Sequence, residues 1–341
     1  MLERPLVAVT LGDPSGIGPE VVAKALTQSR VHEHGRLFVI GNNGVIRQAI
    51  REIGSEASVR QITTPEDAEG TASRIDVLEV ADLPTTFPTG ELSLESAQAS
   101  HGWAEQAAEL AISGDIEAMV TAPVNKEAWR AAGIIDTGHQ ELLKRMSGSS
   151  HVATMLVSGE LRCMHLSTHL SLVEACQYVT QEHVLNTIQL TNDHFIRWGF
   201  NAPRIGVAAL NPHASDGGLI GTTEQDEIIP AIKDAIDLGI EVRGPIPADS
   251  IFNQAIDGEH DVVLVMYHDQ GHIPIKVHGF EESVSVNLGL PFVRTSVDHG
   301  TAFDIAGQNK AQSTSMTEAI LLGTRLAIGR PLGVPNSDTP L

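Results

Sequence analysis

Residues 5–26 read PLVAVTLGDPSGIGPEVVAKAL, an apolar run, a glycine-rich loop and a second apolar run with helical spacing. The first run, PLVAVT, predicts a buried strand, and VVAKAL predicts a helix. The helix would begin near Pro19 with Glu20 in its first turn, where both residues are favourable. The loop is neither a G-x-G-x-x-G motif nor a phosphate loop with Gly-Lys-Ser/Thr, and its glycines are Gly12, Gly16 and Gly18. On its own, the loop is either a tight strand-to-helix connection or part of a ligand site.

The same alternation of strand and helix continues along the chain. Six further β-rich apolar runs are RLFVIGN (36–42), RIDVLEV (74–80), EAMVTAP (117–123), RIGVAAL (204–210), DVVLVMY (261–267) and PFVRTSV (291–297). Segments with apolar residues at helical spacing lie between them, for example 95–112 and 223–239. This alternation predicts an α/β fold with largely parallel sheets. The exception is 152–167, VATMLVSGELRCMHLS, which predicts an antiparallel hairpin that turns at Ser158 and Gly159.

The composition is that of an acidic globular protein. The 341 residues include 22 Lys and Arg against 43 Asp and Glu, a formal net charge of -21. This charge disfavours nucleic acid and anionic membranes as partners, and no apolar run is long enough to span a bilayer. Two cysteines, no C-x-x-C pair and no secretory signal at the start predict a cytoplasmic location.

Three histidines share one position, each directly after an apolar strand. They are His169 in MHLSTHLS, His213 in VAALNPHASDGG and His268 in VLVMYHDQGH, and Asp249 ends a similar segment, GPIPADS. Because ligands bind beyond the carboxyl ends of strands in open α/β sheets, we expect a metal site. Imidazoles with one carboxylate suit Zn²⁺ first, with Co²⁺, Mn²⁺ or Mg²⁺ as alternatives. The competing interpretation is that each side chain only caps its own strand end.

Cations also follow strands in this acidic chain. Lys126 lies in TAPVNKEAW, Lys276 lies beyond His268, and Arg294 follows LGLPFV. Three cations in strand-end loops favour a small anionic substrate, although surface exposure is the usual fate of lysine. The segment 296–307, SVDHGTAFDIAG, has small residues that allow a ligand to approach the backbone and acids that could accept hydrogen bonds from a ribose. Alternatively, this segment is a polar turn.

Together these stretches resemble two related patterns. GDPSGIGPE and HGTAFDIAG are similar to the GDGIGPE and HGSAPDIAG segments of isocitrate/isopropylmalate dehydrogenases. More closely, the chain resembles the 4-hydroxythreonine-4-phosphate dehydrogenase family of pyridoxal phosphate biosynthesis. Over nearly the full length it shows, in that family's order, TAPVNK, TGH, STHLSL, NPHASDGG, PADSIF, MYHDQGHIPIK and LGLPFVRTSVDHGTAFDIAG.

The resemblance implies an architecture. It is a two-domain isocitrate/isopropylmalate dehydrogenase-like α/β fold with the active site in the interdomain cleft. Residues 1–133 and 291–341 would form the first domain, and 134–290 the second. The family is homodimeric with its site at the subunit interface, so His268 is expected to reach the partner's site.

The resemblance also implies roles for single residues. The implied metal ligands are His169, His213 and His268, with Asp249 nearby. The implied substrate-binding positions are His139, Gln140, Lys276, Ser285 and Arg294. The implied NAD-binding residues are Gly12, Asp298, His299, Gly300, Thr301, Ala302 and Asp304. Lys126 is the candidate for proton transfer, because a partly desolvated lysine can titrate near neutrality.

The implied reaction is NAD-dependent and metal-dependent oxidation and decarboxylation of a 4-phosphorylated 3-hydroxy acid, with NADP as the alternative cofactor. Gln140 stands where threonine is usual in the biosynthetic enzyme, and Ser285 stands where asparagine contacts the substrate. These departures and GHIPIK favour 4-phospho-D-threonate or 4-phosphoerythronate over 4-phosphohydroxy-L-threonine. The alternatives are a decarboxylating cis-dihydrodiol dehydrogenase of aromatic diacids, a phosphate acyltransferase-like enzyme and a non-catalytic binder.

Overall fold

The opening stretch forms the elements that the sequence predicts. In the computed structural model, which describes residues 4–329, β1 (Leu6–Thr10) is buried along its length and α1 (Gly18–Leu26) follows the glycine-rich loop. The chain divides into two units. Unit 1 comprises the described residues up to His151 together with Leu290–Ile328, and unit 2 comprises Val152–Gly289 and Gly329. The domain division expected after residues 133 and 290 stays a prediction.

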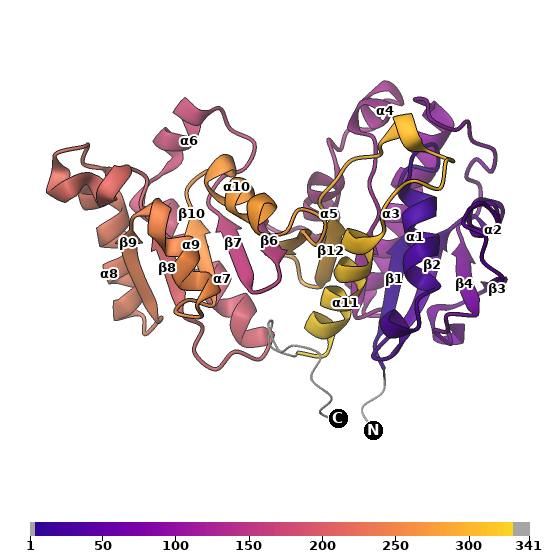
Figure 1. Ribbon diagram of the computed structural model, residues 1–341, viewed down its shortest axis with the longest axis horizontal. Helices are drawn as coiled ribbons and strands as arrows, with labels where there is room; N and C mark the ends of the chain where they lie inside the picture. Colours follow the sequence, from indigo (N-terminus) through magenta and orange to yellow (C-terminus); the bar gives the residue numbers. More distant parts are fainter. Residues whose placement is uncertain (1–3, 330–341) are drawn as a thin grey trace. The chain divides into compact units, whose positions relative to one another are not determined.

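Unit 1 contains a parallel sheet in the order β3-β4-β2-β1-β5-β12. Its other strands are β2 (Arg36–Gly41), β3 (Ser58–Ile62), β4 (Arg74–Glu79), β5 (Ala118–Thr121) and β12 (Val293–Val297). Because β12 pairs with β5, a strand from near the end of the described chain lies beside strands from its beginning (Figure 1). The central strands are buried apolar runs, as expected for a sheet covered on both faces.

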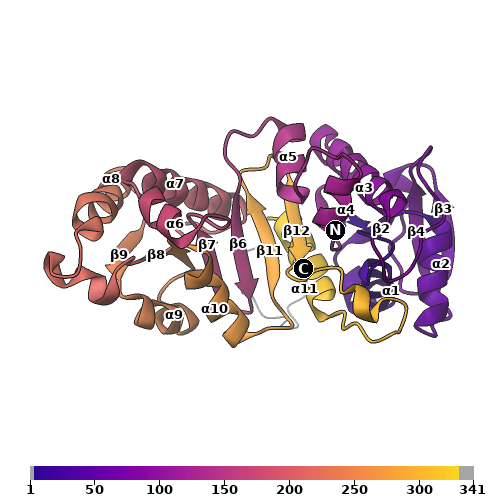
Figure 2. The ribbon, with the colours of Figure 1, turned by 90° about the horizontal axis from the view of Figure 1, so that it is seen from above.

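Helices cover both faces of this sheet. Within unit 1, α3 and α5 lie on the opposite side of the sheet from α1 and α11 (Figure 2). The helices after α1 are α2 (Asn43–Glu52), α3 (Leu94–Ser113), α4 (Lys126–Ala131), α5 (His139–Ser147) and α11 (Thr314–Ala327). Side-chain caps fix the starts of α2, α3 and α4 through Asn42, Ser93 and Asn125, each accepting backbone N–H bonds.

Unit 2 contains a mixed sheet in the order β11-β6-β7-β10-β8-β9. The expected hairpin is confirmed, because β6 (Ala153–Ser158) and β7 (Leu161–His165) pair antiparallel across the turn. β11 (Val284–Leu288) is antiparallel to β6, whereas β7, β10 (Val262–Val265), β8 (Ile205–Ala208) and β9 (Val242–Ile246) are mutually parallel neighbours. The carboxyl ends of these four strands therefore lie at one edge.

The helices of unit 2 also lie on both faces of its sheet, with α7 and α8 opposite α9 and α10 (Figure 2). They are α6 (Leu172–Tyr178), α7 (Gln181–Arg197), α8 (Ile229–Asp237), α9 (Ala248–Ile256) and α10 (His268–His278). Thus the α/β class expected from the sequence is confirmed. Among the described residues, no helix is both long and apolar enough to cross a membrane.

Candidate functional site

In unit 1, three loops meet at the carboxyl edge of the sheet, one after each of β1, β5 and β12. The backbone N–H of Asp13 donates to the Pro123 carbonyl at 2.8 Å, and the N–H of Ile17 donates to the Thr301 carbonyl at 3.0 Å. Gly12 has φ +65°, and a Cβ atom there would collide with the Pro123 carbonyl oxygen. The first loop is therefore a packed junction with the segment predicted to bind NAD.

Asp13 is a feature of this junction that the sequence analysis missed. Its side chain is fully buried, and its Oδ1 accepts the Ser15 N–H at 2.9 Å. Burial raises the pKa of Asp13 to about 6, although hydrogen bonds from the Ser15 and Asn125 backbones act to lower it. Its Oδ2 is buried and has no hydrogen-bond partner among the described residues. The signal available in the sequence was an acidic residue within a loop of glycine and proline. In the structure, the Asn125 backbone links Asp13 to the cap of α4.

A cationic group lies beside this junction, still within unit 1. Arg294 on β12 is 6% exposed, and its Nη2 donates to Thr121 Oγ1 at 2.6 Å. His139, 9% exposed, begins α5 and packs edge-on against Trp129, with ring centroids 5.6 Å apart. Lys126 begins α4 and is exposed. Its side chain lies against Gly138, since a Cβ atom on Gly138 would be only 3.1 Å from the Lys126 Cε. Three of the predicted residues thus gather in one unit.

The pKa values in this group reflect burial beside other cations. Burial lowers the pKa of Arg294 to about 10, and the Glu141 carboxylate opposes this effect. Burial, and then the charges of Arg294, Lys126 and His101, hold the pKa of His139 well below its ordinary value. His139 is therefore neutral near pH 7, and its Nε2 has no hydrogen-bond partner among the described residues. A buried guanidinium beside a neutral imidazole is suited to hold an anion.

The segment predicted to bind NAD follows β12. Asp298 is half-buried, Thr301 is buried, and Ala302 has φ +41°. His299, Gly300 and Asp304 are exposed. The segment therefore presents polar groups and backbone at the same edge as the glycine-rich loop.

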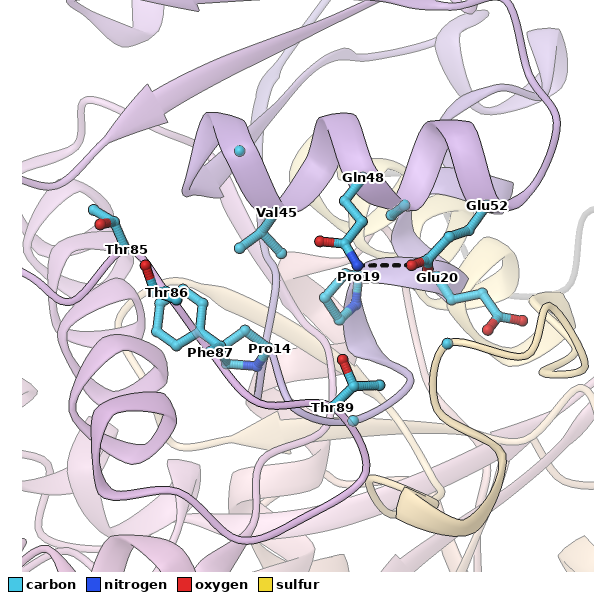
Figure 3. A pocket seen from close by; sticks show the side chains of 14 residues that line it. Pro14, Pro19, Glu20, Val45, Gln48, Glu52, Thr85, Thr86, Phe87 and Thr89 are labelled. Carbon is cyan, nitrogen blue, oxygen red and sulfur yellow. Dashed lines mark hydrogen bonds between the residues drawn. The ribbon is translucent and has the colours of Figure 1, made fainter.

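Gly307, at the end of this segment, lines a cavity of about 260 Å³ (Figure 3). The other walls come from the first loop, from the start of α1, from α2 and from the loop that contains Phe87. On the wall formed by α2, Gln48 Nε2 donates to Glu52 Oε1 at 2.8 Å. Glu20 also lines the cavity; its Oε2 is buried and has no hydrogen-bond partner among the described residues. The lining is therefore polar and partly acidic.

In unit 2, the four predicted metal ligands follow four neighbouring parallel strands. His169 follows β7, His213 follows β8, Asp249 lies after β9 in the first turn of α9, and His268 follows β10. His268 is half-buried, and the other three are exposed. Across residues 4–329, no group of three or more His, Cys, Asp or Glu is assembled to hold a metal within one chain. The structure thus brings the four loops to one edge without closing a metal site.

His268 has the tautomer that a metal ligand needs. Its Nδ1 lies 2.7 Å from Asp269 Oδ1, and a carboxylate oxygen only accepts, so Nδ1 carries the proton. In the neutral imidazole of this tautomer, Nε2 has a lone pair for a metal, an arrangement common in metal-binding histidines. The donor chemistry at His268 therefore fits a divalent metal.

His213 lies in a turn of the opposite hand to ordinary helices. Residues 213–218 all have positive φ, from +46° at Asp216 to +99° at Gly218. Each non-glycine residue in this region costs about 1–2 kcal/mol. Glu224 anchors the start of the turn, because its carboxylate accepts from the backbone N–H and the side-chain amide of Asn211 at 2.7 and 2.9 Å. Such strain persists where the surroundings enforce it, and it clusters at functional sites.

The remaining predicted substrate contacts are divided between the units. Gln140 is half-buried next to His139 on α5 in unit 1. Ser285 is half-buried on β11 of unit 2, opposite Leu156. Lys276, late in α10, has its Nζ 4.9 Å from the centroid of the Phe280 ring. Each unit therefore contributes positions from the predicted substrate set.

Comparison with known proteins identifies the family of this chain. The family model of the pyridoxal phosphate biosynthetic protein PdxA matches residues 33–323. The chain is 42% identical to a D-threonate 4-phosphate dehydrogenase of Cupriavidus necator, covering 96% of this chain and 98% of the relative. It is 44% identical to a 4-hydroxythreonine-4-phosphate dehydrogenase of Beijerinckia indica, covering 97% of each.

A solved structure gives the same result. The crystal structure of the 4-hydroxythreonine-4-phosphate dehydrogenase of Klebsiella pneumoniae matches with a TM-score of 0.89 at 37% identity, over 95% of this chain and 98% of that one. The motifs, the fold and these relatives agree along almost the whole chain. The chain therefore belongs to the PdxA family and is an oxidoreductase of the dehydrogenase class.

Proposed function

We propose that the protein oxidises and decarboxylates a 4-phosphorylated 3-hydroxy acid, with NAD as the oxidant and a divalent metal. The observation that carries this proposal is the buried pair of Arg294 and His139 in a chain with a net charge of -21. A cation so deeply buried in an acidic protein is suited to an anionic group such as a phosphate. Membership of a dehydrogenase family implies the nicotinamide cofactor.

The substrate that we favour is 4-phospho-D-threonate or 4-phosphoerythronate. The relatives named for D-threonate 4-phosphate and for 4-hydroxythreonine-4-phosphate are 42% and 44% identical, so overall identity does not separate the two. Gln140 and Ser285 keep hydrogen-bonding ability but differ in reach from the residues of the biosynthetic pattern. If the amino acid were preferred instead, the enzyme would belong to pyridoxine biosynthesis.

The chain's own residues have separable tasks in this reaction. Arg294, His139 and Lys276 would hold the phosphate. Lys126 would accept the hydroxyl proton as hydride leaves the same carbon for NAD⁺, which gives a β-keto acid. Because Lys126 is exposed in the single chain, its desolvation would come from the bound substrate. Loss of CO₂ then leaves an enolate, which takes up a proton at carbon.

The metal would be held by His169, His213 and His268, with Asp249 beside them. When bound, it would act as a Lewis acid for the developing alkoxide and enolate oxygens. Three imidazoles favour Zn²⁺, with Co²⁺, Mn²⁺ and Mg²⁺ as alternatives. The proton on His268 Nδ1 supports this assignment, because it leaves Nε2 for the ion.

The cofactor would be NAD rather than NADP. Gly12 and residues 298–304 would contact it, and the adjoining cavity supports the choice. Its described lining includes the carboxylates of Glu20 and Glu52 and contains neither lysine nor arginine. Because Lys24 pairs with Glu20 at 2.8 Å, the like charge that an extra 2′-phosphate would meet there is chiefly that of Glu52.

The active form would be a cytoplasmic homodimer with the site at the subunit interface. Unit 2 supports the dimer because several of its large apolar side chains are strongly exposed. They include Val173 (69%), Leu219 (88%), Val277 (82%) and Phe280 (71%). Exposed apolar side chains in such number suit contact with a second copy, which would bring His268 to the partner's site.

The deciding experiment is a substrate panel followed by NADH absorbance. The panel contains 4-phospho-D-threonate, 4-phosphoerythronate, 4-phosphohydroxy-L-threonine and a terephthalate cis-dihydrodiol, each with added Zn²⁺, Co²⁺ or Mn²⁺. We expect the highest kcat/KM with the phosphorylated sugar acids, and released CO₂ equal to the NADH formed. Turnover of the dihydrodiol alone would favour the alternative dehydrogenase. No NADH with any member would favour an acyltransferase-like enzyme or a binder.

A further inference from the structure

Two histidines lie one helical turn apart at the start of α10. His268 and His272 stack face to face, with ring centroids 3.5 Å apart and an interplanar angle of 11°. His272 Nδ1 also lies 3.0 Å from the carbonyl oxygen of His268 and 3.1 Å from Nε2 of His165. The ring beneath His268 is therefore itself tied to the sheet.

His165 and the His268 carbonyl oxygen together fix the tautomer of His272. His165 is 1% exposed on β7, and its Nδ1 lies 3.2 Å from the Thr154 carbonyl oxygen. A carbonyl only accepts, so Nδ1 of His165 carries the proton; burial and the neighbouring His272 keep this imidazole neutral by lowering its pKa to about 3. Nε2 of His165 is then an acceptor, so Nδ1 of His272 is the donor, and its N–H is shared between this Nε2 at 3.1 Å and the His268 carbonyl oxygen at 3.0 Å. A chain of hydrogen bonds thus runs from the His272 N–H through His165 to the Thr154 carbonyl, which is the final acceptor.

The backbone of α10 makes room for this chain. A Cβ atom on Gly271 would collide with His165 Nε2, so only glycine lets the imidazole approach the helix closely enough to reach His272. On the other side, Asp269 Oδ1 accepts a hydrogen bond from the Nδ1–H of His268. His268 is therefore held through its ring edge by Asp269 and through its ring face by His272.

From this geometry we propose that His272, anchored by His165, is a positioning residue that fixes the ring plane of His268 and pre-orients its Nε2 toward the metal. The proposal rests on the proposed function, in which His268 is a metal ligand. His272 acts through the stack and not by touching substrate or metal. Partners that orient a metal-binding histidine typically change metal affinity on the order of 10- to 100-fold when removed.

Four side chains at position 272 separate the two contacts. Phenylalanine in His272→Phe keeps the stack and loses the hydrogen bond to His165. Glutamine in His272→Gln keeps a donor for His165 and loses the stack, and His272→Ala loses both. The matched control is His278→Ala, which removes an exposed histidine from the same helix. Circular dichroism and thermal unfolding without metal verify that each full-length variant is folded.

The readouts are the Co²⁺ dissociation constant, measured by competition with a chromophoric chelator, and the visible spectrum of the Co²⁺ protein. We expect His272→Ala to weaken binding on the order of 10- to 100-fold with the wild-type band positions kept. His272→Phe and His272→Gln should fall between wild type and His272→Ala, and His278→Ala should bind as wild type.

Wild-type affinity and spectrum in folded His272→Ala would overturn the positioning role. So would a changed spectrum together with a loss as large as that of His268→Ala, because His272 would then be a ligand itself. His268→Ala and His213→Ala test the underlying site separately. If both bind Co²⁺ as wild type does, the metal site of the proposed function fails, and the positioning role fails with it.

Discussion

Replacing Arg294 by methionine should leave the protein as stable as before, or more stable, while weakening its hold on phosphate. Methionine fills much of the same volume without the charge. At about 1.4 kcal/mol per pKa unit, the lowering of the Arg294 pKa to about 10 disfavours the buried cation by about 3 kcal/mol. The lost hydrogen bond to Thr121 offsets about 1.5–3 kcal/mol of that. From these two terms, the net change in the free energy of unfolding should lie between about zero and +1.5 kcal/mol.

The functional loss should be large and specific to the phosphate. One hydrogen bond from a charged donor contributes about 1.5–3 kcal/mol, so kcat/KM for the phosphorylated substrate should fall about 10- to 150-fold. Inorganic phosphate should also become a weaker competitive inhibitor. Arg130→Met, at an exposed arginine on α4, is the matched control and should change neither quantity.

Urea unfolding without ligand and initial rates of NADH formation measure the two effects. A loss of more than about 2 kcal/mol in the free energy of unfolding would refute the reasoning about burial. Unchanged inhibition by inorganic phosphate would refute the role of Arg294 as a phosphate contact.

Four further predictions concern the metal, the assembly, the first loop and the cofactor. His213→Ala should lose turnover while calorimetry shows unchanged NAD binding; full activity after chelator treatment would contradict the metal site. Inactive His169→Ala and His268→Ala chains should regain activity when mixed and allowed to exchange, unless each site is built from one chain. Because its pKa is raised to about 6 on folding, Asp13 binds its proton more tightly in the folded state, so stability should fall by about 3 kcal/mol as pH rises from about 4 to 6. Asp13→Asn should flatten that part of the curve of urea midpoint against pH. NAD should give at least about tenfold higher kcat/KM than NADP, and Glu52→Lys should narrow this ratio by relieving like-charge repulsion of about 1 kcal/mol or more.

The sequence predicted much of the fold because local patterns determine it. The seven apolar runs all became strands, and the predicted hairpin formed with its turn at Gly159 and Glu160, one residue later than expected. Strands β3, β9 and β11 were missed. The first two, SVRQI and VRGPI, carry exposed polar residues or proline at the edges of their sheets, where burial imposes no clear alternation.

The candidate site was harder to predict because distant segments build it. Position after a strand identified Lys126 and His213, since parallel strands bring their ends together. The burial of Arg294 beside His139 could not be predicted, because it depends on β12 pairing with β5. Similarly, the contact of His165 with His272 joins a hairpin strand to a helix from much later in the chain.

The left-handed turn at residues 213–218 indicates that this sequence was not selected for stability alone. Its dihedral angles are those of a mirror-image helix, which glycine adopts without penalty and other natural residues resist. If only ease of folding mattered, glycine would serve at Ala214, Ser215 and Asp216 as it does at Gly217. The chain keeps side chains there and tolerates the unfavourable backbone. Glycine at Ala214, Ser215 or Asp216 should therefore make the protein more stable. Any function lost in such a variant would show what that side chain contributes beyond the fold.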